Sequence, residues 1–230
     1  MKVLGIIPAR GGSKGVVRKN IRQVAGQPLI AWTIQAAQKS VHITNFYVST
    51  DDEEISELAK EHGAEVLLRP GSLALDKSPM IPAIQHACNQ AESVHGKFDY
   101  IVLLQPTAPQ RTATDIDAAL KILDENNKID SVISVYLVED AHPSRMYTLE
   151  DGSLVKYAQE PKGSLRQDLA DVYHRNGAIY ACHRDILMNK GLLIGENTAP
   201  YIMPKDRSGN IDDITDLYVT DLLLRMQYNK

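Results

Sequence analysis

The amino-acid sequence predicts an α/β fold, a mostly parallel β-sheet with helices on both faces. Apolar β-type runs alternate with helical segments from residue 3 to residue 138, which is the pattern of parallel sheets. The first run, residues 3–7, leads directly into a glycine-rich loop, an arrangement typical of sheets that bind ligands at the carboxyl ends of their strands. The 230 residues are 43% hydrophobic and 23% charged, as expected for one globular domain over residues 1–230.

Capping residues and apolar spacing predict the individual elements. Asp51 or Asp52 can cap a helix over residues 53–62, and Thr112 forms a capping box with Asp115. Further helices are predicted at 27–39, 81–92, 112–126 and 215–227, and strands at 46–49, 66–68, 100–104, 131–138, 176–181 and 201–203.

The alternation is interrupted after residue 138. Two apolar runs, 147–149 and 154–157, flank the turn sequence Glu-Asp-Gly-Ser, which predicts a β-hairpin. We expect this hairpin to lie within a segment, at about 142–175, that is inserted into the single domain.

The loop after the first strand indicates a phosphate site. Glycine allows backbone N–H groups to approach an anion closely, and neighbouring cations neutralise it. The loop matches neither a Walker A loop nor a dinucleotide fingerprint, and on glycine and charge alone a solvated surface loop explains it equally well. Its glycines are Gly11, Gly12 and Gly15, and its basic residues are Arg10, Lys14, Arg18 and Lys19.

The distribution of charge favours the phosphate interpretation. The first fifty residues contain seven Lys or Arg and no Asp or Glu, although an even distribution of the 29 acidic residues would place about six there. The net charge of the whole chain is −4. Positive potential concentrated at one end suits a small polyanion such as a nucleoside triphosphate, whereas a nucleic-acid-binding domain is basic overall. We therefore expect no nucleic-acid partner.

Targeting signals are not evident in the sequence. The longest apolar runs are shorter than a membrane span, and the first residues lack the pattern of a signal peptide. The expectation is a cytoplasmic protein without a membrane partner, in which Cys88 and Cys182 are free buried thiols.

Several motifs together resemble one enzyme family. Residues 7–15 read Ile-Pro-Ala-Arg-Gly-Gly-Ser-Lys-Gly, with Lys19-Asn20 following, and residues 103–111 read Leu-Leu-Gln-Pro-Thr-Ala-Pro-Gln-Arg. This order and spacing resemble the CMP-acylneuraminate synthetase family, cytidylyltransferases that activate sialic acids and related nine-carbon sugars. The remaining matching motifs are Ser49-Thr50-Asp51, Arg166-Gln167, Asn176-Gly177-Ala178-Ile179-Tyr180 and Ile211-Asp212 with Asp216.

The resemblance implies a reaction and an architecture. The reaction is the attack of the anomeric hydroxyl of a nonulosonic acid on the α-phosphorus of CTP, which yields a CMP-sugar and pyrophosphate. The architecture is a Rossmann-like nucleotide-diphospho-sugar transferase fold. The family implies Mg2+ or another divalent cation as cofactor. It also implies a homodimer in which the inserted hairpin is a dimerisation arm and contributes to the partner's sugar pocket.

The candidate nucleotide-binding residues come mainly from the glycine-rich loop. Its cations and amides are expected to bind the triphosphate, and by resemblance Asn20 reaches the nucleoside. Arg10 and Lys19 are also candidate catalytic residues because they relieve negative charge at the reacting phosphates. The full nucleotide-binding set is Arg10, Gly11, Gly12, Ser13, Lys14, Lys19, Asn20, Arg69 and Ser78.

Asp212 is the main candidate for catalysis and metal binding. The family places an Asp-Xaa-Asp pair where this chain has Asn210-Ile211-Asp212. Asn is a weaker, neutral oxygen donor, so we expect one ion on Asp212 with Asn210 beside it and leave a two-metal arrangement open. Helix capping is the alternative role for Asp212, as for Asp213 and Asp216.

The candidate sugar-binding residues are implied by the resemblance. A sugar acid needs amide groups and a basic side chain for its carboxylate. Arg111 is a candidate for the substrate or for the pyrophosphate surroundings. The full set is Gln105, Arg111, Arg145, Arg166, Asn176 and Tyr180.

Two other functions stay open at this point. A glycosyltransferase-like protein or sugar-1-phosphate nucleotidyltransferase shares the strand-to-basic-loop entrance, and a non-catalytic nucleotide-binding regulator could keep the loop. Asp212 and the full set of cations favour an active enzyme. The sequence does not distinguish N-acetylneuraminate, legionaminate and pseudaminate as substrates.

Overall fold

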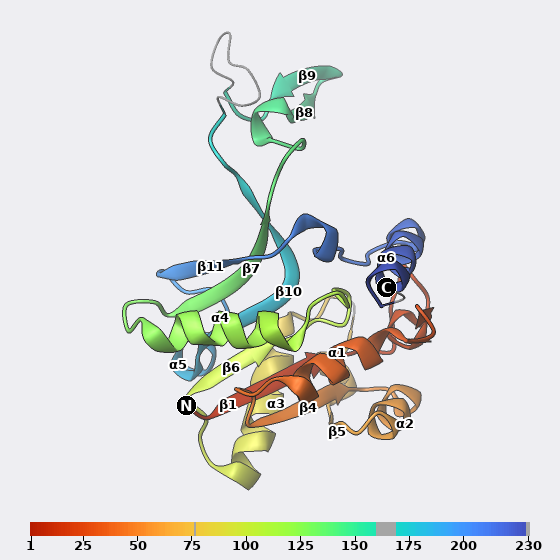
Figure 1. The fold of residues 1–230 in the computed structure, drawn as a ribbon, viewed down its shortest axis with the longest axis vertical. Helices are drawn as coiled ribbons and strands as arrows, with labels where there is room; N and C mark the ends of the chain where they lie inside the picture. The colour runs from red at the N-terminus through yellow and green to blue at the C-terminus, as the bar shows by residue number, and fades with distance from the viewer. Residues whose placement is uncertain (76, 160–168, 229–230) are drawn as a thin grey trace.

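A seven-stranded sheet forms the centre of the protein (Figure 1). The computed structural model describes residues 1–75, 77–159 and 169–228. The strand order is β11-β7-β10-β6-β1-β4-β5, and every neighbouring pair is parallel except the two pairs that involve β10. The strands are β1 (Val3–Pro8), β4 (Asn45–Thr50), β5 (Glu65–Leu68), β6 (Tyr100–Leu103), β7 (Ser131–Leu137), β10 (Tyr173–His183) and β11 (Thr198–Ile202).

Helices cover both faces of the sheet, which confirms the predicted mostly parallel α/β fold. Along β1, Val3 and Ile7 face one core cluster while Leu4 and Ile6 face the other, because successive side chains of a strand point to opposite faces. On the first face lie α1 (Leu29–Lys39), α2 (Glu53–Glu61) and α4 (Ala113–Glu125); on the second lie α3 (Met80–His95) and α5 (Arg184–Met188).

Two predicted caps are present. The Asp52 carboxylate accepts from the Ile55 amide at 3.0 Å at the start of α2, and Thr112 forms the reciprocal capping box with Asp115 at the start of α4. The predicted start of the first helix at residue 27 is wrong by two residues. Gln27–Pro28 instead form the short strand β3, which pairs with β2 (Gln23–Val24).

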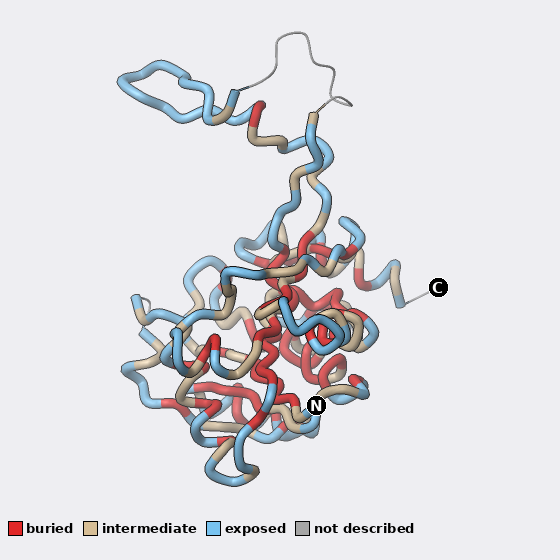
Figure 2. The backbone as a smooth tube through the Cα atoms, turned by 90° about the vertical axis from the view of Figure 1, so that its left-hand side faces the viewer, coloured by how far each residue is buried: buried red, intermediate tan, exposed pale blue. Residues whose placement is uncertain are grey.

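A hairpin projects away from the body of the protein, as Figure 1 shows. It consists of β8 (Tyr147–Glu150) and β9 (Ser153–Lys156), and its turn has positive φ at Asp151 and Gly152. Every residue of both strands is exposed, whereas the buried residues gather in the body (Figure 2). The predicted hairpin is confirmed, and Arg166 lies outside the described residues.

The last helix brings the end of the chain to its beginning. Leu217 and Leu224 of α6 (Ile214–Tyr228) pack in a small core cluster with Val16 and Ile211. Val16 belongs to the glycine-rich loop and Ile211 to the candidate metal segment, so this cluster holds the two segments together. Among the described residues, no helix is long and apolar enough to cross a bilayer.

Candidate functional site

A cavity of about 450 Å³ opens at the carboxyl edge of the sheet, a volume within the usual range for small-molecule sites. The loops after β1 and β6 and the segment before α6 meet there. The cavity therefore brings together most of the predicted nucleotide-binding residues and the predicted metal pair. Its predicted lining residues are Arg10, Ser13, Lys14, Lys19, Asn20, Arg69, Ser78, Gln105, Asn210 and Asp212.

Lys19 joins the two ends of the chain inside this cavity. Its ammonium donates to the carbonyl of Ile211 at 2.5 Å and lies 3.9 Å from a carboxylate oxygen of Asp212. Burial lowers the pKa of Lys19, an effect that the Asp212 charge opposes and the Arg10 charge reinforces. A partly desolvated ammonium interacts more strongly with an incoming anion than a solvated one does.

Gly15 permits the close approach of these two segments. A Cβ atom at this position would collide with the backbone carbonyl of Asp212. Packing against residues 210–212, the candidate metal segment, therefore requires a glycine at position 15. Around Gly12, in contrast, the space is open, which leaves the outer part of the loop accessible.

Acidic residues of the next strand-to-helix turn support the loop from behind. The Gly11 amide donates to an Asp51 carboxylate oxygen at 3.3 Å, and the Arg18 guanidinium pairs with Asp52 and Glu54. Gly11 and Gly12 are not among the residues that line the cavity. The expectation that their amides bind phosphate therefore stays a prediction. Arg18 therefore connects the loop to the start of α2 through these ion pairs.

Arg69, the residue directly after β5, also lines the cavity. Its side chain is 5% exposed and lies 3.4 Å from Asp51. Burial lowers the pKa of its guanidinium, partly offset by Asp51. Within the described part of the chain its Nε has no hydrogen-bond partner, and a buried donor in this state favours an acceptor from a ligand.

One wall of the cavity was missed by the sequence analysis. It is formed by η2 (Gly71–Leu73), the residues after it and the first turns of α3. The sequence predicts only a helix over 81–92 in this region, because the spacing of its apolar residues is that of an ordinary buried helix face. The wall consists of Leu73, Ala74, Leu75, Pro79, Met80 and Ala83.

A second cavity of about 370 Å³ adjoins the first, and Gln105 and Asn210 line both. Tyr180, predicted from the sequence, lies in it. Gly177 has φ +74°, and a Cβ there would stand 2.8 Å from the Gln105 side-chain oxygen, so the glycine leaves room for Gln105. Residues Tyr173, His174 and Arg175 also line this cavity; their place on the strand before the Asn-Gly motif was the available signal.

The acidic residues at the start of α6, Asp212, Asp213 and Asp216, have different roles. The Asp216 carboxylate accepts from the amides of Asp212 and Asp213 at 2.9 and 3.0 Å, and the Asp216 amide donates to Asp213. Capping therefore falls to Asp213 and Asp216. The Asp212 side chain is 76% exposed and accepts from the Asn210 amide nitrogen at 2.6 Å.

The donor set at Asp212 is compatible with a single hard cation. A carboxylate and an amide oxygen are suitable ligands for Mg2+, which usually takes few protein ligands and completes its shell with phosphate and water. The described residues contain no group of three His, Cys, Asp or Glu side chains able to hold a metal. The residues present therefore fit an ion shared with a bound phosphate.

Arg111 is corrected from a ligand-binding to a structural residue. It is 2% exposed and lines neither cavity. Its guanidinium donates to the carbonyls of Gln105 and Ala108 and to the Thr33 hydroxyl at 2.6–3.0 Å, and burial lowers its pKa. It supports the loop that carries Gln105 from inside the protein.

Two other predicted sugar ligands are placed differently from Gln105. Asn176 borders the second cavity, but its amide is engaged with Ser134 and Ser208 at 2.6 and 2.9 Å. Arg145 lies in η3 (Pro143–Arg145) at the base of the hairpin, pairs with Asp140 at 3.5 Å and lines neither cavity of its own chain.

Comparison with known proteins identifies the family. Residues 4–202 match a family model described as cytidylyltransferase. The chain belongs to the cytidylyltransferase family. The predicted resemblance is thus confirmed.

Relatives cover this cytidylyltransferase chain from end to end. It is 34% identical to an N-acylneuraminate cytidylyltransferase of Escherichia coli, over 100% of this chain and 53% of that protein. It is 36% identical to the CMP-N,N'-diacetyllegionaminic acid synthase of Legionella pneumophila, over 98% of this chain and 97% of that one. The chain therefore spans about half the length of the former and almost all of the latter.

The fold also matches a solved structure of CMP:2-keto-3-deoxy-manno-octonic acid synthetase complexed with CTP. The TM-score is 0.73 over 99% of this chain and 100% of that one, with 18% sequence identity. At this identity the match shows a common fold.

We predict that removing a cation from the first cavity weakens CTP binding. Arg10→Ala or Lys19→Ala should each raise the dissociation constant by roughly tenfold or more, because a charge-assisted contact contributes about 1.5–3 kcal/mol. Isothermal titration calorimetry measures this. Lys39→Ala, which removes the same charge outside the cavity, is the control, and unchanged CTP affinity in both cavity variants would contradict the assignment.

Proposed function

We propose that this cytidylyltransferase transfers the CMP group of CTP to the anomeric hydroxyl of a nonulosonic acid and releases pyrophosphate. One observation carries the proposal: a cation-lined cavity and a polar cavity share Gln105 and Asn210, with Asp212 lining the first. A triphosphate in the first cavity and a sugar acid in the second would place their reacting atoms at this junction. The relatives' names support the same substrate classes.

The residues of the first cavity have complementary roles in this proposal. Arg10, Lys14 and Lys19 bind the triphosphate and disperse the charge that grows on its oxygens during displacement. Arg69 and the apolar wall around Met80 hold the nucleoside. Holding the α-phosphorus in a fixed position makes the attack of the sugar effectively unimolecular.

The second cavity orients the sugar. Gln105 donates and accepts hydrogen bonds through its amide, and Arg175 offers a cation for the sugar carboxylate. The aromatic side chains of Tyr173 and Tyr180 give the sugar ring a surface to contact. The hydroxyl on the anomeric carbon then faces the first cavity, where its proton must be removed as the bond to phosphorus forms.

Asp212 would hold Mg2+ or another divalent cation, with the amide oxygen of Asn210 beside it once that amide turns from its hydrogen bond to Asp212. When bound, such an ion polarises phosphate oxygens and lowers the pKa of a coordinated hydroxyl. The Asp212 carboxylate remains exposed because Asp213 and Asp216 cap the helix in its place. The protein fixes the position of the Asp212 carboxylate and its distance of 3.9 Å from the Lys19 ammonium.

A homodimer joined through the hairpin completes the proposal. Leu149 and Leu154 of the hairpin are 74% and 70% exposed, and a two-stranded hairpin with an exposed apolar surface is marginally stable alone. A second copy of the chain would cover this surface and bring Arg145, at the base of the hairpin, towards a sugar cavity. Because the reaction consumes CTP, we place it in the cytoplasm.

A substrate panel tests the proposed reaction. With CTP and Mg2+, the protein should release pyrophosphate when given N-acetylneuraminate, legionaminate or pseudaminate, and the best of the three identifies the sugar. Coupled phosphate detection measures the rate, with a sugar 1-phosphate and UTP as the control for another nucleotidyltransferase specificity. Release from none of the three acids, together with measurable CTP binding, would contradict the proposal and favour a nucleotide-binding regulator.

Loss of the Asp212 carboxylate should reduce turnover more than nucleotide affinity. We predict that Asp212→Ala lowers kcat by about a hundredfold or more, the usual size for losing a main electrostatic contact in the transition state, while CTP affinity without metal stays near the parental value. Asp213→Asn removes the same charge at the capping residue and should leave kcat unchanged. Asn210→Asp should be tolerated and should tighten Mg2+ binding. Parental turnover in Asp212→Ala would contradict the assignment.

The hairpin should be required for dimerisation. Sedimentation velocity at micromolar concentration should show a dimer for the parent and a monomer for Leu149→Asp/Leu154→Asp, because a buried unpaired carboxylate disrupts an apolar interface. Val41→Asp, at an apolar position 81% exposed on the body, should remain dimeric. A parental monomer with full activity would exclude the dimer.

A further inference from the structure

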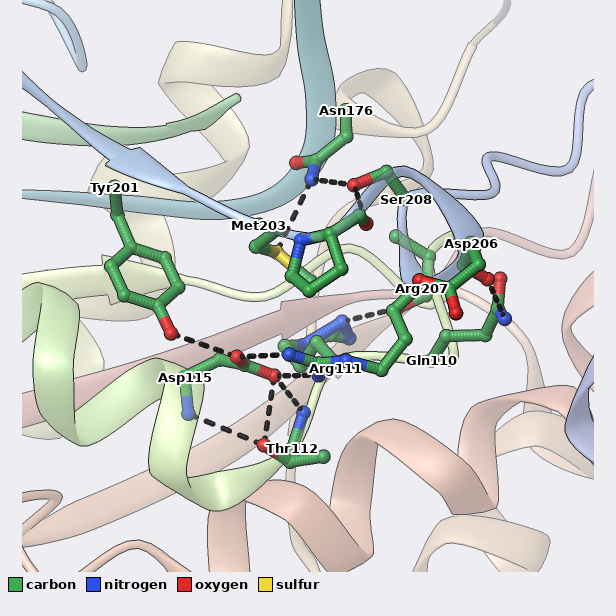
Figure 3. Close-up of polar contacts among 12 residues, drawn as sticks. Gln110, Arg111, Thr112, Asp115, Asn176, Tyr201, Met203, Asp206, Arg207 and Ser208 are labelled. Carbon is green, nitrogen blue, oxygen red and sulfur yellow. Dashed lines mark hydrogen bonds and ion pairs between the residues drawn. The ribbon is translucent and has the colours of Figure 1, made fainter. Parts of the chain in front are cut away.

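Asp115 carries more hydrogen bonds than its helix cap requires. Its side chain is 3% exposed, and the Thr112 amide donates to it at 2.8 Å, which completes the capping box. The Tyr201 hydroxyl donates to the same carboxylate at 2.8 Å, and Arg207 donates through both terminal nitrogens at 2.6 and 3.0 Å (Figure 3). The two latter residues follow Asp115 by 86 and 92 positions.

These bonds keep the pair charged. Burial raises the pKa of Asp115, but the hydrogen bonds from Arg207, Thr112 and Tyr201 outweigh burial and hold the pKa below its ordinary value. A bidentate Arg–carboxylate contact fixes both position and orientation. The pair therefore acts as a rigid connection between the first turn of α4 and η5 (Lys205–Arg207).

Arg207 precedes the candidate metal segment by a few residues. On both sides of Arg207 the chain is bound to the loop after β6. Gln110 donates to the carbonyl of Asp206 at 2.6 Å and accepts from the amide of Gly209 at 3.3 Å. The Ile211 amide then donates to the carbonyl of Thr107 at 2.8 Å. Figure 3 shows Gln110 and Asp206 beside the Asp115–Arg207 pair.

The same loop positions the shared residue of the two cavities. Gln105 begins it, and Arg111 supports the Gln105 carbonyl from inside at 2.8 and 3.0 Å. The candidate metal segment, residues 210–212, and the loop that carries Gln105 are thus bound to each other, and the Asp115–Arg207 pair joins the elements next to them, η5 and the first turn of α4. Neither member of the pair lines either of the two cavities described above.

We propose that the Asp115–Arg207 ion pair is a positioning device that sets the place of Asp212 relative to Gln105, and hence the metal affinity of the CTP-bound protein. The inference rests on the proposed metal role of Asp212. The Arg207 side chain pairs with Asp115, so its effect on Asp212 would pass through the backbone of residues 208–212. It is a positioning residue because it touches neither substrate.

Metal binding tests the proposal directly. Mn2+ titrated into the protein with saturating CTP, followed by electron paramagnetic resonance, should bind Arg207→Met about twofold to thirtyfold more weakly than the parent, the usual range for a residue that acts on a site through connecting contacts. CTP affinity without metal should stay unchanged, and amide hydrogen exchange over residues 208–212 should accelerate in the metal-free protein. Lys205→Ala is the matched control in the same turn, because it removes a cation that pairs with Glu139 at the surface and leaves the Asp115–Arg207 pair in place.

A second variant separates positioning from misfolding. Asp115→Asn keeps the shape of the cap and should weaken Mn2+ binding in the same way. The double variant should be no worse than either single one, because both remove one contact. Parental Mn2+ affinity in Arg207→Met and Asp115→Asn, or an equal loss of metal-free CTP affinity, would overturn the inference while the proposed function stands. Equal Mn2+ binding by the parent and Asp212→Ala would overturn the metal assignment and this inference with it.

Discussion

The site depends on a constraint at Lys19. Cations that bind a triphosphate and a carboxylate that binds a metal must lie a few ångströms apart without neutralising each other. The Lys19 ammonium bonds to the Ile211 carbonyl and forms only a long ion pair, at 3.9 Å, with the Asp212 carboxylate. Both groups line the cavity, where a ligand can compete for them. Partial burial of Lys19 strengthens its attraction for an anion, and the exposure of Asp212 leaves it open to a cation.

This arrangement requires residues from the two ends of the chain to meet. Gly15 allows the contact because any larger residue would strike the Asp212 carbonyl. Val16 and Ile211 then bury their side chains together against α6. The hydrophobic cluster holds the loop and the metal segment at a distance that the charges alone would not set, since isolated surface charges in water have little directional preference.

Local signals explain what the sequence could predict. The capping residues Asp52 and Thr112, the strand before the glycine loop and the hairpin turn all depend on neighbours within a few positions. Arg111 and the antiparallel direction of β10 do not. The sequence shows Arg111 as a cation in a motif, whereas in the structure it is buried and also donates to the hydroxyl of Thr33, a residue distant in the chain. The apolar wall near Met80 was missed for a different reason. A helix face that lines a cavity has the same residue spacing as a helix face that packs in a core.

The two halves of the site depend on different parts of the fold. The proposed triphosphate half is lined by the loops after β1 and β6, the segment from Arg69 to the first turns of α3, and the segment before α6, all within the body. The proposed sugar half includes Tyr173, His174 and Arg175, the first residues of the strand that returns from the region of the hairpin. Its antiparallel direction places these residues at the carboxyl edge, beside the loop after β6. Along the chain, the hairpin (residues 147–156) is much nearer to these residues than to the loop after β1. A dimer formed through the hairpin would therefore act on sugar recognition and leave the binding of CTP to the body.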